Sequence, residues 1–264
     1  MLSVPSLEML TRIGFAARGI MYLIVGYLAL RFGRSEGGSG ALAYLAEGAG
    51  KAVLGVMALG FLAYGFWRLA EAIVDTEGHG TDAKGKAARA GGFVSGLVHL
   101  GLAFLAARLA FGRSGGSGSG AQEGAATALS LPGGSMLLIA VSAALLATGL
   151  WQLVKSVKGD FLRHLEAKAS QRTWVMWLGR AGYAARGIVF LITGWFALQA
   201  GLSADAGKAG GMEQALSALS GTVLAAVALG LALFGLFSFV EARYRRINDP
   251  QVLARLGGGA RARG

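Results

Sequence analysis

Six long apolar segments restrict this chain to one class of structure. They cover roughly residues 13–30, 52–74, 90–111, 136–154, 181–200 and 222–240, and each is close to the about 20 residues that cross a bilayer as a helix. Mean hydropathy is +0.55 and 15% of the residues are charged, values outside the usual range of soluble domains. The segments are apolar on all sides and lack the alternating polarity of barrel strands. The sequence therefore predicts an all-α membrane protein with six transmembrane helices.

A repeated pattern groups the six segments into three pairs. Residues 180–195 and residues 12–26 follow the same pattern, and a weaker copy begins at Arg89. Each copy starts a pair of apolar segments, so we predict three repeated helical hairpins, which could surround a pseudo-threefold axis. The hairpin units are expected at residues 8–75, 86–158 and 176–247, with a basic and aromatic cytoplasmic linker at 159–175 and a basic, flexible tail at 248–264.

The 25 Lys and Arg residues are unevenly distributed among the loops. Most of them lie near the two chain ends, between the second and third segments, or between the fourth and fifth segments. These regions share one side if the helices alternate, so the positive-inside rule predicts cytoplasmic N- and C-termini. Topology and anionic lipid headgroups account for the net charge of +11, so no nucleic acid is expected. The linker at 159–175 is expected to contact anionic lipid or, as the alternative, a protein partner.

Two arginines lie unusually deep in the predicted helices. Arg18 and Arg186 each lie six residues inside the first Arg of their unit, which corresponds to about 9 Å of helix rise. An intramembrane Arg costs at least about 2.5 kcal/mol at the helix centre, so each side chain should reach the interface or find an acceptor. The middle unit has Ser95 at the equivalent position.

Each deep arginine has a glutamate within its own unit. The second helices of units one and three end near Glu71 and Glu241, on the same side of the membrane, whereas the middle unit has Lys155 there. Because the middle unit has lost both partners, we predict structural ion pairs within units, Arg18 with Glu71 and Arg186 with Glu241. The alternative is a site for an anionic headgroup or solute at the cytoplasmic mouth.

One histidine, His99, falls inside an apolar segment. An intramembrane ionisable residue is a functional candidate, and histidine can bind haem or relay protons. However, His79 and His164 fall in loops, and the repeat alignment places His99 where Tyr22 and Phe190 stand. A packed, hydrogen-bonded core histidine is therefore the favoured interpretation. We expect no catalytic residues, no metal, no cofactor and no enzymatic activity.

The repeated helix carries a recognisable signature. Residues 180–194 read Arg-x-Gly-Tyr-Ala-Ala-Arg-Gly-x-x-x-Leu-x-x-Gly, a short turn follows, and the second helix of a unit ends in Gly-x-Trp. This pattern resembles the bacterial membrane family catalogued as domain of unknown function 1206, over about residues 8–247. The resemblance implies three tandem two-helix units in a multi-pass protein of the bacterial inner membrane. It implies no activity, and unit two departs from the pattern at Gly92, Ser95 and His99.

Two functions fit these observations. The first is a structural membrane protein that binds lipid or a protein partner, which the basic cytoplasmic surfaces and the lack of a catalytic motif favour. The alternative is a channel or transporter with a pathway between the three hairpins, since internal repeats are common in transport folds. Few polar residues fall inside the apolar segments, which favours the first function.

Overall fold

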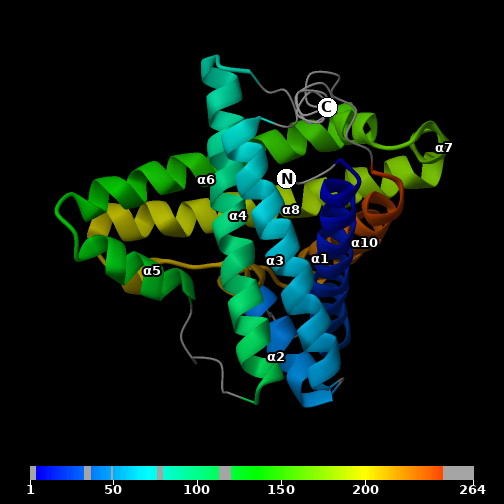
Figure 1. The fold of residues 1–264 in the computed structure, drawn as a ribbon. Coiled ribbons are helices and arrows are strands. Elements are labelled where there is room, and N and C mark those ends of the chain that lie inside the picture. Colours follow the sequence, from blue (N-terminus) through cyan, green and yellow to red (C-terminus); the bar gives the residue numbers. More distant parts are fainter. Residues whose placement is uncertain (1–3, 33–36, 49, 76–79, 113–119, 246–264) are drawn as a thin grey trace, which may run out of the picture.

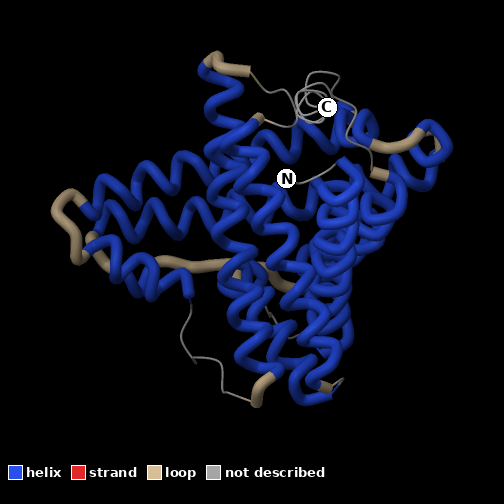
Figure 2. Tube along the Cα trace, viewed as in Figure 1, coloured by secondary structure: helices blue, strands red, loops and turns tan. Residues whose placement is uncertain are grey.

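The computed structural model describes residues 4–32, 37–48, 50–75, 80–112 and 120–245. Helices make up nearly all of these residues, as Figure 2 shows. No β-strand occurs within the described ranges, where one isolated antiparallel bridge joins Leu165 to Arg245. The all-α class is confirmed, and the expected flexible tail at 248–264 lies outside the described residues.

Six helices are long and apolar enough to cross a membrane, as the sequence predicts. Their bounds are α1 Val4–Phe32, α3 Lys51–Val74, α4 Ala83–Ala110, α6 Gly134–Lys158, α8 Thr173–Ser203 and α10 Gly221–Tyr244. All of them begin before the predicted apolar segments, by nine residues in α1 and by seven in α4.

Short helices connect the long ones. Between the two long helices of each unit lies one short α-helix, and each buries apolar side chains, among them Leu42, Ala125 and Leu216. These helices therefore pack against the long helices and help to close the ends of the bundle. The short elements are α2 Gly38–Gly48, α5 Gly120–Leu129, α7 Ala167–Ser170 and α9 Met212–Ser217, with 3-10 turns η1 Asp160–His164 and η2 Ala206–Lys208.

The long helices pack mainly between units. The second helix of each unit contacts the first helix of the next, so that α3 packs on α4, α6 on α8, and α10 on α1. Within units, α1 also packs on α3, and α8 on α10. The main contacts of α4 and α6 are with helices of other units. The repeats are therefore connected in a cyclic order that includes the first and last units.

Equivalent glycines lie at the three crossings between units. At each crossing a Cβ added to either glycine would lie 2.8 to 3.1 Å from the carbonyl oxygen of the other. Because such contacts leave no room for a side chain, the backbones approach as in small-residue crossings of membrane helices. The three pairs are Gly65 with Gly96, Gly149 with Gly187, and Gly235 with Gly19.

Small residues also mediate the packing within units one and three. A Cβ added to Gly60 would lie 2.6 Å from the Cβ of Ala17, and one added to Gly230 would lie 2.6 Å from the Cβ of Ala185. These two contacts are equivalent in the repeat alignment. They bring the two long helices of each of these units together as a hairpin.

The middle unit differs at these positions. It has the larger Val94 in place of the alanine and Ala144 in place of the glycine, and Val94 is 60% exposed. The ring of six helices is therefore open between α4 and α6, and the pseudo-threefold arrangement is not confirmed. In Figure 1, α1, α3 and α4 run side by side, while the paired α6 and α8 cross this group steeply.

Candidate functional site

Arg18 is the centre of a buried polar cluster between α1, α3 and α10. Its side chain is 6% exposed, and all three of its nitrogens have partners. Nη2 forms an ion pair with Glu241, Nη1 donates a hydrogen bond of 3.0 Å to the Tyr64 hydroxyl, and Nε donates one of 3.1 Å to Ser238 Oγ. The burial of this guanidinium is therefore offset by charge-assisted hydrogen bonds.

Aromatic rings and a second arginine complete the cluster. The Arg18 Cζ lies 4.4 Å from the ring centroid of Phe15 and 4.8 Å from that of Phe234, distances at which cation–π attraction contributes. Arg245 Nη1 donates to the second oxygen of Glu241 at 3.1 Å. The Arg245 Cζ also lies over the Phe15 ring, 4.9 Å from its centroid. The charged groups of the cluster are bound by one another and by its rings, which is typical of a structural contact between helices.

The ion pair of Arg18 crosses between units, in contrast to the predicted pairing within units. Arg18 of unit one binds Glu241 of unit three because α10 packs on α1 through the Gly19 and Gly235 crossing. Glu71 lies instead at the crossing of α3 and α4, where its Oε2 is 3.2 Å from Arg68 Nη1. Both glutamates are buried and lie in ion pairs, and the carboxylate that binds Arg18 is that of Glu241 and not the predicted Glu71.

Arg186 has surroundings unlike those of Arg18. Its Cζ lies 4.5 Å from the ring centroid of Phe234, 5.4 Å from that of Phe190 and 5.6 Å from that of Tyr22. Its buried Nε has no hydrogen-bond partner among the described residues, and the salt bridges found there include none to Arg186. The predicted pair with Glu241 is replaced by contacts of that carboxylate with two other arginines.

The sequence interpretation missed three members of the Arg18 cluster, which are Tyr64, Ser238 and Arg245. A signal existed for two of them, because Ser238 and Arg245 lie three residues before and four residues after Glu241 and so share its helix face. Tyr64 could not be found in this way, since its role depends on how α3 packs against α1.

His99 lies in an aromatic environment on α4. Its Nδ1–H donates a hydrogen bond of 2.7 Å to the Ser95 carbonyl oxygen, and its ring centroid is 4.4 Å from that of Tyr64 and 6.0 Å from that of Phe61. This matches the expected packed, hydrogen-bonded histidine. Among the described residues, no group of three or more His, Asp or Glu side chains could hold a metal ion.

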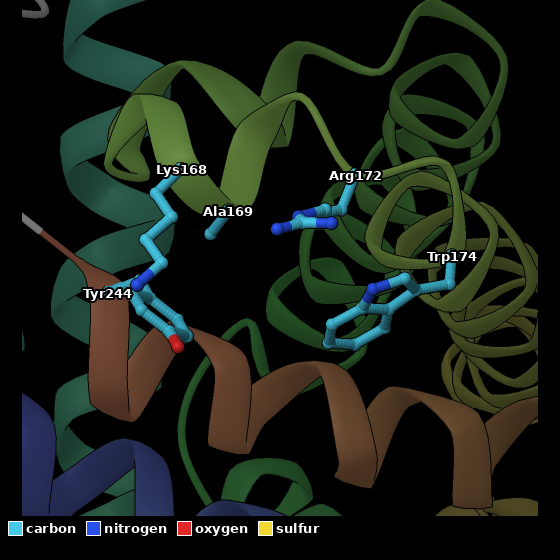
Figure 3. Close-up of a pocket in the computed structure, with 5 residues that line it drawn as sticks. All are labelled: Lys168, Ala169, Arg172, Trp174 and Tyr244. Carbon is cyan, nitrogen blue, oxygen red and sulfur yellow. The ribbon is translucent and has the colours of Figure 1, made fainter.

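A basic pocket lies where the linker meets the end of α10. It has a volume of about 180 Å³ and is lined by Lys168, Ala169, Arg172, Trp174 and Tyr244. In Figure 3 the Arg172 guanidinium points into the space between Lys168 and Trp174, and the Lys168 side chain extends toward the end of α10 that carries Tyr244. The pocket thus combines two cations with two aromatic side chains that carry polar groups.

Backbone bonds hold the linker in place at this pocket. The Glu166 N–H donates to the Tyr244 carbonyl oxygen at 2.9 Å, next to the isolated bridge between Leu165 and Arg245. Phe161 is buried against Gly179 at the start of α8. The predicted basic and aromatic linker is therefore attached to two long helices, which fixes the pocket residues.

The fold and these sites define a multi-pass α-helical membrane protein built from three repeated two-helix units. The family model described as Domain of Unknown Function (DUF1206) matches residues 13–75, 90–159 and 181–245, one segment in each unit. The chain belongs to this family. It is also similar to the uncharacterized protein YxxB of Bacillus subtilis (strain 168), with 30% identity over 256 residues that cover 92% of this chain and 93% of the relative. No solved structure matches the chain significantly.

Proposed function

We propose that the protein is a structural, lipid-binding protein of the bacterial inner membrane, without enzymatic activity and with both termini in the cytoplasm. One observation carries the proposal: the pocket of Lys168, Arg172, Trp174 and Tyr244 at the junction of the linker and α10. The closed Arg18 cluster supports the structural part of the proposal because its cation and carboxylate satisfy each other. The distribution of Lys and Arg supports the orientation.

The chemistry of the pocket fits an anionic lipid headgroup. Lys168 and Arg172 can donate charge-assisted hydrogen bonds to phosphate oxygens, and juxtamembrane basic residues contribute about 1 kcal/mol each toward anionic lipid. Trp174 and Tyr244 are side-chain types that concentrate at the level of the headgroups. The linker joins α6 to α8, so the pocket lies where two spans leave the bilayer.

The test compares a pocket variant with a charge-matched control. The pocket variant is Lys168→Gln with Arg172→Gln, and the control is Lys86→Gln with Lys158→Gln, which removes the same charge from exposed positions on the same side. Native mass spectrometry would count phosphatidylglycerol bound to each protein after extraction from mixed phosphatidylglycerol and phosphatidylcholine nanodiscs. We expect the pocket variant to lose most of the bound phosphatidylglycerol and the control to keep it.

Equal retention by both variants would overturn the lipid assignment. A protein that co-purifies with the wild type and is lost from the pocket variant would make the pocket a docking site for that partner instead. Either result identifies what binds in the pocket. Thermal unfolding of both variants checks that the loss of binding does not come from loss of the fold.

A channel or transporter is the second candidate, and one observation favours it. The ring of helices is open between α4 and α6, where a Cβ added to Gly91 would meet no atom within 4 Å and Thr148 is exposed. Flux of chloride or phosphate into liposomes that contain the protein would support this function. Absence of flux at protein densities that give flux with a known channel would exclude it.

A further inference from the structure

The three crossings between units carry equivalent positions with different charges. At the crossing of α10 and α1, the guanidinium of Arg18 meets three acceptors, which are Ser238, Tyr64 and Glu241. Arg18 and Arg245 share one carboxylate at this crossing, that of Glu241. We compare the other two crossings with this one. Each has an equivalent pair of glycines, so the positions of the three crossings can be aligned.

At the crossing of α3 and α4 a buried carboxylate is also paired with an arginine. Ser95 takes the place of the arginine, and Glu71 takes the place of Glu241. A guanidinium is supplied from a different position, since Arg68 on α3 lies 3.2 Å from Glu71. The chain thus restores a cation next to the buried carboxylate although the usual arginine is missing.

At the crossing of α6 and α8 the equivalent carboxylate is missing. Arg186 keeps the arginine, but its three equivalent acceptor positions hold Gln152, Phe234 and Lys155. A phenyl ring has no hydroxyl, and an ammonium group cannot accept a hydrogen bond. Arg186 and Lys155 therefore stand where Arg18 and Glu241 stand at the crossing of α10 and α1. None of the three positions equivalent to the Arg18 acceptors carries a carboxylate.

Two buried polar atoms at this crossing are unsatisfied. Within the described residues, Arg186 Nε and Gln152 Oε1 are both buried without a hydrogen-bond partner, and Gln152 is 6% exposed. A buried polar group without a partner is costly, and the cost is larger for a charged group within a membrane. The aromatic contacts of Arg186 offset this cost only in part, because they satisfy no N–H group.

The Lys155 ammonium and the Arg186 guanidinium each lie over one of two neighbouring aromatic rings. Lys155 Nζ lies 5.9 Å from the ring centroid of Tyr183, Arg186 Cζ lies 4.5 Å from that of Phe234, and the two ring centroids are 5.4 Å apart. Lys155 stands at the helix position that Glu241 has at the crossing of α10 and α1, near the end of α6. A ligand could therefore approach from the headgroup region.

We propose that the crossing of α6 and α8 is a phosphate-binding site, in which a phosphate group takes the place that the Glu241 carboxylate has beside Arg18. Arg186 donates to the phosphate oxygens, Lys155 supplies the second positive charge, and Gln152 donates through its amide N–H group. The phosphate belongs either to an anionic lipid or to a free anion, which share this chemistry. The site is separate from the linker pocket and does not depend on lipid binding there.

The decisive variant is Lys155→Glu. It places a carboxylate at the position equivalent to Glu241, so Arg186 gains an internal partner and the phosphate site is lost. Lys158→Glu is the matched control, with the same charge change on the same helix at an exposed position. Arg186→Gln removes the principal donor. Unfolding temperatures are measured for each protein in neutral detergent, with inorganic phosphate or with phosphatidylglycerol added.

For the wild type we expect phosphate or phosphatidylglycerol at saturating concentration to raise the unfolding temperature by about 5 °C. Lys155→Glu should unfold at a higher temperature than the wild type without ligand and show no further rise with it. Lys158→Glu should keep the full response. A response to inorganic phosphate identifies a free anion as ligand, and a response to phosphatidylglycerol alone identifies the lipid headgroup.

Two results would overturn the inference. One is a wild type that responds to neither ligand. The other is a response that Lys155→Glu and Arg186→Gln retain in full. If the response is lost instead in the variant Lys168→Gln with Arg172→Gln, the ligand binds in the linker pocket, so failure of this inference is distinguishable from failure of the proposed function.

Discussion

At the scale of single residues, the Arg18 cluster explains how a buried guanidinium is tolerated. Its partners come from three helices, with Tyr64 on α3 and both Ser238 and Glu241 on α10. Breaking a buried pair by removing one member costs about 3–5 kcal/mol, because the other charge stays buried. The two members are not equivalent here, since Glu241 also binds Arg245 at 3.1 Å.

This asymmetry predicts the order of two substitutions. Glu241→Gln leaves the guanidinium groups of Arg18 and Arg245 without their shared carboxylate, so it should lower the free energy of unfolding by about 3–5 kcal/mol. Arg18→Gln leaves Glu241 with Arg245 and should cost less. Unfolding in detergent by added denaturant measures both, and a double-mutant cycle gives their coupling. Coupling of Arg18 to Glu71 in place of Glu241 would contradict the pairing.

His99 gives a second prediction at this scale. Its hydrogen bond goes to the Ser95 carbonyl oxygen four residues earlier, within the helix, and the equivalent position in unit three is Phe190. His99→Phe should therefore change the free energy of unfolding by less than about 1.5 kcal/mol, as for other volume-conserving changes. A larger loss, or the loss of a visible absorption band from protein purified out of native membranes, would show that the imidazole has a ligand.

At the scale of helices, glycine spacing determines which helices meet. A Cβ added to Gly235 would lie 2.8 Å from the Gly19 carbonyl oxygen and 2.9 Å from the Leu23 backbone nitrogen, so Gly235→Ala should separate α10 from α1 and cost about 1–3 kcal/mol. The control is Gly55→Ala on α3, where an added Cβ meets no atom within 4 Å. It should stabilise the helix by about 0.5–1 kcal/mol. Thermal unfolding of the two variants should shift in opposite directions.

The helices could be predicted from the sequence, whereas their partners could not. Apolar length and the repeat identified all six spans, and the cost of charge in lipid led to the predicted pairs of Arg18 with Glu71 and of Arg186 with Glu241. The pairing within units assumed that a hairpin is the main contact of each helix. The stronger contacts run between units, through glycines such as Gly19 and Gly235, and one copy of a repeat does not reveal which other copy it meets.

At the scale of the whole molecule, the three units follow a cyclic order with one contact missing. Each second helix meets the first helix of the next unit, and only the middle unit lacks close packing between its own helices within the described residues. Helices that cross one bilayer tilt by at most about 40° from its normal. Since α6 and α8 cross α1, α3 and α4 steeply in Figure 1, we expect the two groups to rotate toward a common direction in a membrane.

This rotation predicts a contact between α4 and α6 in the bilayer. By equivalence with Gly60 and Ala17, the residues that meet are Ala144 and Val94. The chain has no cysteine, so the variant Val94→Cys with Ala144→Cys has a single pair of thiols that a short cross-linker can join. We expect cross-linking within one chain in membranes and less in detergent, where no bilayer aligns the helices. Val94→Cys with Met136→Cys, which lies two turns away near the start of α6, is the control and should not cross-link. If the first pair also fails to cross-link in membranes, the ring stays open there, and the exposed faces of α4 and α6 are covered by lipid alone.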